Sequence, residues 1–190
     1  MPKPVPQGTR VEAIPNAWLR GNPECLSQCV HLIGGIVIQW SLIEAVLAQI
    51  YSNLACLPEV DGIATTGHWI AIETFERVQS IAAKRGALLA ACDKRGITHG
   101  TKKRLADVLK EAQTLYDNSR IPSAHGKWML PRQYMNDSLI FIRNAGKSED
   151  AELYSIEDLE AALRELTTLG HTLTDVLEQV LIPELEGKTP

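Results

Sequence analysis

A long apolar stretch near the N-terminus most constrains what this chain can fold into. Its large apolar residues recur at steps of three and four, the spacing that puts side chains on one face of an α-helix. They are Leu32, Ile36, Trp40, Ile43, Leu47, Ile50 and Leu54. Asn22 suits the N-cap position, and Pro58 ends helical hydrogen bonding. We therefore predict one buried helix over about 22–57, in which Gly34 and Gly35 mark a close backbone approach or a kink.

The same periodicity predicts a second helix. It begins at about Asp61 or Thr66, runs to Cys92 and stops at Gly96, because a residue without a Cβ readily ends a helix. Its core candidates are Ile70, Phe75, Val78, Ile81, Ala82, Leu88 and Leu89.

Two more helices follow from their start and stop signals. The third opens at Thr98 or Thr101, and its apolar face leads directly to Arg120, which we expect at the helix end. The last helix starts at residues 155–158, where Ser-Ile-Glu-Asp has the form of a capping box, and Pro183 marks its end.

Short apolar segments separated by turn residues precede the last helix, at 128–130, 138–142 and 152–154. They predict two or three small strands or an extended flap. Residues 1–21 hold four prolines and are predicted to form an extended arm. The predicted fold class is all-α: an up-and-down bundle of about four long helices with a small β-hairpin or flap insertion before the last helix, in a single domain over 22–186.

Charge is unevenly distributed along this chain, whose formal net charge is −4. Basic residues gather between Lys84 and Arg104, and acidic residues dominate from Glu149 to Glu186. This asymmetry is compatible with an RNA-facing surface and also with the plainer interpretation of solvated helix ends.

The four cysteines, Cys25, Cys29, Cys56 and Cys92, do not have the pattern of a disulfide framework and are predicted to be reduced thiols. Cys25 and Cys29 lie one helical turn apart near His31, but no second pair with ligand spacing follows. Packing is therefore favoured over metal binding, and we expect no metal and no cofactor.

Segment 1–21 is polar and proline-rich rather than a basic stub followed by an apolar run, so we expect no signal peptide and a cytoplasmic location. The longest apolar run, Cys29 to Ala48, contains several polar side chains and Glu44. This pattern favours a core helix over a membrane span.

Arg120 and His125 lie on either side of a helix break at Pro122. A guanidinium is a permanently charged fork of donors that suits a phosphate, and a histidine, with an unperturbed pKa of about 6.5, exchanges a proton near neutrality. With Gly126 and Trp128, this pair resembles the arginine-x4-6-histidine signature of HEPN domains. The resemblance implies an all-helical fold and a homodimer in which two motifs face each other. It also implies a metal-independent RNase of the toxin–antitoxin or defence-system kind.

On this resemblance the catalytic residues are Arg120, which would hold the phosphate, and His125, which would move the proton. The polar residues around them either contact the RNA or cap the backbone. The candidate substrate-binding residues are Asn118, Ser119, Ser123 and Lys127.

Two alternatives stay open, because HEPN domains usually have Asn, Asp or His directly after the arginine and this chain has Ile121. The first is a non-catalytic helical dimer that serves as a binding or regulatory module, partnered by a separately encoded nucleotidyltransferase-like antitoxin. The second is a small-ligand-binding bundle with a cavity lined from Gly34 to Glu44, in which His31, Gln39 and Glu44 supply the polar groups.

Overall fold

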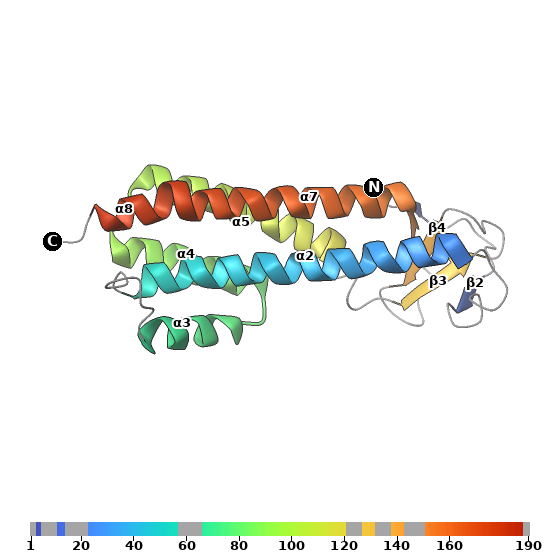
Figure 1. Ribbon diagram of the computed structural model, residues 1–190, viewed down its shortest axis with the longest axis horizontal. Helices are drawn as coiled ribbons and strands as arrows, with labels where there is room; N and C mark the ends of the chain where they lie inside the picture. The colour runs from blue at the N-terminus through green and yellow to red at the C-terminus, as the bar shows by residue number, and fades with distance from the viewer. Residues whose placement is uncertain are drawn as a thin grey trace. The chain divides into compact units, whose positions relative to one another are not determined.

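The computed structural model describes residues 3–4, 11–13, 23–56, 66–120, 127–131, 138–142 and 151–187. The chain divides into two compact units, the first made of Met1–Gln39 with Asp117–Leu166 and the second of Trp40–Tyr116 with Thr167–Pro190. Helices α2 (Pro23–Ala55) and α7 (Ile156–Asp175), both labelled in Figure 1, each contribute residues to both units. The predicted helical bundle with a small β element before the last helix is confirmed, whereas the single domain over 22–186 stays a prediction.

The first unit contains a five-stranded antiparallel sheet of order β1-β5-β4-β3-β2. Its strands are β1 (Lys3–Pro4), β2 (Val11–Ala13), β3 (Lys127–Pro131), β4 (Ser138–Ile142) and β5 (Ala151–Ser155). The last three are the predicted strands. The first two come from the proline-rich arm and form both edges of the sheet, where a residue without an N–H is tolerated.

A close approach of two helices explains one of the two glycines of α2. A Cβ built on Gly35 lies 3.3 Å from Leu163 Cδ2 of α7, within the first unit. A Cβ on Gly34 meets nothing within 4 Å. Gly35 therefore marks the predicted close approach, and Gly34 does not.

The predicted second helix is wrong in one respect, because it is two helices. These are α3 (Thr66–Glu76) and α4 (Ile81–Arg95), both in the second unit. Ser80 starts α4, since its hydroxyl accepts a hydrogen bond from the Ala83 N–H at 3.1 Å. Of the predicted core residues, Phe75 and Ile81 are buried but Ile70 is 59% exposed. Gly96, with φ of 68°, ends α4 as predicted.

Helix α5 (His99–Leu115) begins as predicted, with the Thr98 hydroxyl accepting from the Thr101 N–H. The end of the last helix is a second correction. Helix α7 continues through a π-helical segment, η3 (Val176–Leu181), into α8 (Ile182–Glu186). Pro183 does not end it, because it lies in the first turn of α8, where a missing N–H costs no hydrogen bond.

The apolar stripe that dominates the sequence is the core. Every predicted residue of the stripe from Leu32 to Leu54 is buried. In the second unit, residues of α4, α5 and η3 complete this core, among them Leu88, Leu105 and Leu181.

The two glycines give a test of local packing. Gly34→Ala is expected to raise the free energy of unfolding by about 0.5–1 kcal/mol, because alanine favours helix and has space here. Gly35→Ala is expected to gain less or to lose stability, because Leu163 must move to admit the Cβ. Urea denaturation of both variants measures the difference, and equal stabilisation of the two would contradict the close approach.

Candidate functional site

The structure places the residues before the predicted motif in a π-helical turn, η1 (Tyr116–Arg120), directly after α5. Arg120 is the last residue of this turn, which confirms its predicted position at a helix end. The Asn118 side chain is exposed. π-Helical turns are rare and occur frequently at functional sites.

Parts of the predicted site cannot be compared with the structure. His125 and Ser123 lie outside the described residues. For Ser119, Arg120 and Lys127 the structure describes the backbone alone. Lys127 opens β3 and pairs with Ile142 of β4.

Tyr154 of β5 contacts the chain on both sides of the motif. Its hydroxyl lies 3.4 Å from the Asn118 carbonyl oxygen and 3.1 Å from Glu152 Oε2, so its single hydrogen serves one acceptor at a time. Its ring packs edge-on against Trp128, with centroids 5.3 Å apart and planes at 71°. The side chain is buried, at 6% exposure. One residue therefore ties the turn before the motif to the strand after it.

The start of α7 closely follows Tyr154 in the chain. The Asp158 carboxylate accepts hydrogen bonds of 3.0 Å from both the N–H and the hydroxyl of Ser155, and the Ser155 hydroxyl accepts from the Asp158 N–H at 3.1 Å. This is the predicted capping box. Burial by itself raises the pKa of Asp158, but hydrogen bonds, among them those from Ser155, outweigh it and hold the pKa below its usual value.

Sequence analysis did not identify Tyr154, because the register between strands cannot be determined from a single sequence. Register places Leu139 opposite Tyr154, and Trp128 opposite Phe141 on the far side of β4. An available signal was that each of the three predicted strands contains one aromatic residue, namely Trp128, Phe141 or Tyr154.

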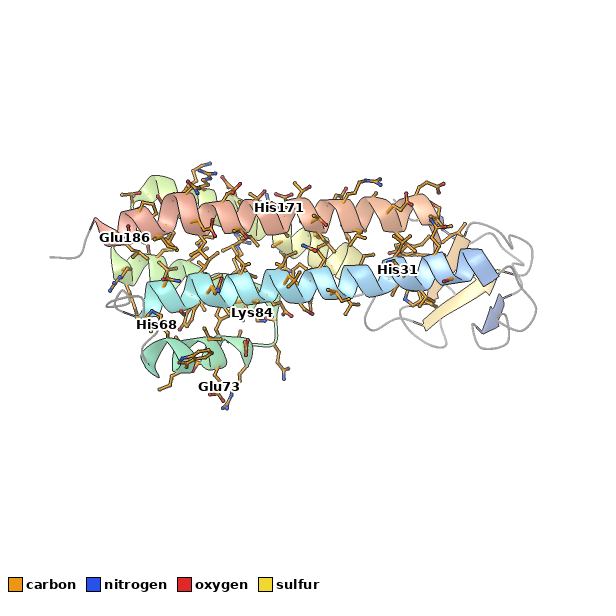
Figure 2. The ribbon with its side chains drawn as sticks, in the orientation of Figure 1. His31, His68, Glu73, Lys84, His171 and Glu186 are labelled. Atoms are coloured by element: carbon orange, nitrogen blue, oxygen red, sulfur yellow. The ribbon has the colours of Figure 1, made fainter. Side chains whose placement is uncertain are left out.

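Sequence analysis also did not predict an ion pair in the second unit. Lys84 Nζ lies 2.8 Å from Glu44 Oε1 and 5.7 Å from the centre of the Phe75 ring, and the Lys84 side chain is only 7% exposed. Lys84 is labelled in Figure 2. Lys84 lies three residues after Ile81 and four before Leu88, and this spacing already placed it on the buried face.

This pair bears on the small-ligand alternative. The Glu44 carboxylate is occupied by Lys84, and His31 is exposed on α2. The ligand cavity lined from Gly34 to Glu44 stays a prediction.

The basic segment is partly neutralised within the chain. Besides Lys84, Lys102 pairs with Asp93, and Lys103 pairs with Asp107 at 2.9 Å. Within the described part of the chain, Arg85, Lys94, Arg95 and Arg104 have no ion pair, so these four carry the remaining positive charge of the segment.

Cys29, Cys56 and Cys92 are free thiols, and burial raises the pKa of Cys92 to about 11. No group of three metal-ligating side chains occurs among the residues that the structure describes. The α2 segment Ser27–Ala55 is long and apolar enough to cross a membrane by length and composition, a test that core helices also pass. The predicted location therefore stays a prediction.

No protein-family model, curated protein or solved structure matches this chain. The fold thus defines the class, a helical bundle with a small antiparallel sheet. The HEPN resemblance rests on the residues of the motif.

Breaking the buried ion pair is expected to destabilise the protein. Glu44→Gln should lower the free energy of unfolding by about 1–3 kcal/mol, because it leaves the Lys84 ammonium buried without its counter-charge. Adding Lys84→Met should recover much of the loss, and the matched surface variant Glu73→Gln should have little effect. Guanidinium denaturation checks this. If the double variant is as unstable as Glu44→Gln, the ion pair is not the cause.

The capping box is expected to make stability sensitive to acid. Because the pKa of Asp158 is lowered on folding, its contribution is complete above the unfolded value of about 3.9 and is lost as the pH falls through the lower folded value. Urea unfolding between about pH 6 and pH 2 should give a flatter acid limb for Asp158→Asn than for wild type. Asp175→Asn, on the same helix, is the control, and an equal flattening in it would contradict this assignment.

Proposed function

We propose that this protein is a HEPN-like, metal-independent endoribonuclease that acts as a homodimer and serves as a toxin or defence-system component. The observation that carries the proposal is the position of the motif. Arg120 ends a π-helical turn, and Tyr154 contacts both the turn before the motif and Trp128 after it. The two ends of the segment that contains Arg120 and His125 thus contact one buried residue.

The chemistry needs few groups, because RNA carries its own nucleophile. The 2′-hydroxyl attacks the adjacent phosphorus, the bond from phosphorus to the 5′-oxygen breaks, and the products are a 2′,3′-cyclic phosphate and a 5′-hydroxyl. His125 takes the proton from the 2′-hydroxyl or gives one to the leaving oxygen. Arg120 binds the phosphate and stabilises its developing charge. In a dimer, the second histidine performs the complementary proton transfer.

The neighbouring polar residues would position the substrate. Asn118, Ser119, Ser123 and Lys127 are the proposed contacts to phosphate and ribose, since hydroxyl, amide and ammonium groups are the usual donors to a nucleic-acid backbone. None of these steps uses a metal or a cofactor.

A second candidate function is a non-catalytic helical dimer that binds a regulatory partner such as an antitoxin protein. The observation that favours it is the exposed apolar surface of α2, where Val30, Ile38 and Leu42 are 42%, 65% and 56% exposed. A contiguous exposed patch of apolar side chains is typical of protein-binding surfaces. Ile121, in place of the family's polar residue, points the same way.

Cleavage of a panel of RNAs in the presence of a chelator tests the nuclease. We expect products that end in a 2′,3′-cyclic phosphate, and a loss of about 100-fold or more in both Arg120→Ala and His125→Ala. Arg77→Ala and His171→Ala remove exposed residues of the same types elsewhere and should retain activity. Circular dichroism verifies that every variant is folded.

RNA cleavage separates the two candidates, because both are dimers. If light scattering shows a dimer but the wild type cuts no RNA, the binding module replaces the nuclease. If His125→Ala is folded and still cuts, His125 is not the proton-transfer group and the proposed mechanism is wrong.

A further inference from the structure

A pocket of about 410 Å³ lies in the second unit between α2 and α4. Tyr51, Leu54 and Ala55 line it from α2, at the three- and four-residue spacing of one helix face. Its volume falls within the range of roughly 300–1,000 Å³ that small-molecule sites occupy. The pocket therefore has room for a small ligand.

Alanines on α4 create the hollow. Ala87, Ala90 and Ala91 share one face of that helix and line the pocket, where larger side chains would fill the space. Opposite them, the ring of Tyr51 stacks on Phe75 of α3, with centroids 4.9 Å apart and planes at 23°. Packing thus fixes one wall, and short side chains leave the other open.

The charged residues that line this pocket are both cations, Lys94 and Arg95. Neither side chain makes an ion pair or a hydrogen bond within the described part of the chain. The neighbouring acid, Asp93, is already paired with Lys102. The pocket therefore presents two unpaired positive charges beside an apolar floor.

These cations are not needed to close the end of α4. The Gly96 N–H donates to the Asp93 carbonyl at 3.1 Å, and the Ile97 N–H donates to the Cys92 carbonyl at 3.0 Å. This backbone pattern is a Schellman motif, which satisfies the terminal carbonyls without a side chain. Both cationic groups stay available to a ligand.

We propose that this pocket binds a small organic acid with an apolar body, such as a medium-chain carboxylate. The apolar body lies on Leu54 and the alanines, and the carboxylate lies against Lys94 and Arg95. A guanidinium and an ammonium together match the two oxygens of a carboxylate with charge-assisted hydrogen bonds. The site lies in the second unit and does not depend on the proposed nuclease.

Octanoate and octanol are the probes that test the site, because they share a chain and differ in charge. Titration into protein with ¹³C-labelled alanine methyl groups is expected to shift the Ala87, Ala90 and Ala91 signals saturably with octanoate. Octanol should bind at least about tenfold more weakly, since it cannot form the charge-assisted contacts. Equal affinity for the two probes, or no saturable shift with octanoate, would overturn the proposal.

Two variants with a matched control assign the contacts. Lys94→Gln with Arg95→Gln should weaken octanoate binding by about tenfold or more and leave octanol unchanged. The control, Lys103→Gln with Arg104→Gln, removes two adjacent exposed cations from α5 and should change neither. Ala90→Leu, checked for folding by circular dichroism, should reduce both by filling the hollow. Unchanged octanoate binding in the Lys94 and Arg95 variant would overturn the site.

Discussion

Burial of the apolar stripe on α2 is the constraint on which the rest of the structure depends. A helix with so few charged residues must cover one face, and the seven residues of its stripe, from Leu32 to Leu54, are all buried. Helices α4 and α5 contribute fully buried leucines to the same core, namely Leu88, Leu105 and Leu109. The buried cation Lys84 is accommodated because Glu44, on the same helix as the stripe, neutralises it. Hydrophobic burial thus decides the fold, and the polar contacts are arranged around it.

Prediction from the sequence succeeded where one local rule decides the outcome. The period of α2, the Ser155 capping box, the Gly96 stop and the three strands before α7 each follow from nearby residues. It failed where two rules compete. The apolar pattern continues across the break between α3 and α4, but Ser80 acts as an N-cap and starts a separate helix there. Pro183 was expected to end the last helix, but that helix forms a π-helical segment before Pro183 and continues past it.

The candidate site shows the same division. Arg120 at the end of a helical turn followed from the amphipathic face of α5, which is local information. Tyr154 did not, because its contacts with Asn118 and Trp128 join residues that are distant in the sequence. The sequence shows that Lys94 and Arg95 are charged, but their apolar surroundings arise only when α2 and α4 pack together. Tertiary contacts, rather than local patterns, therefore create both surfaces.

The edge strands carry a consequence for biosynthesis. Lys3 pairs with Leu153, and Val11 pairs with Pro131, so each edge strand is synthesised long before the strand with which it pairs. The sheet is consequently a late event, completed after the local helices have had time to form. One of its edge strands, β1, ends in Pro4, which has no N–H to donate to a further strand and so discourages pairing with other chains.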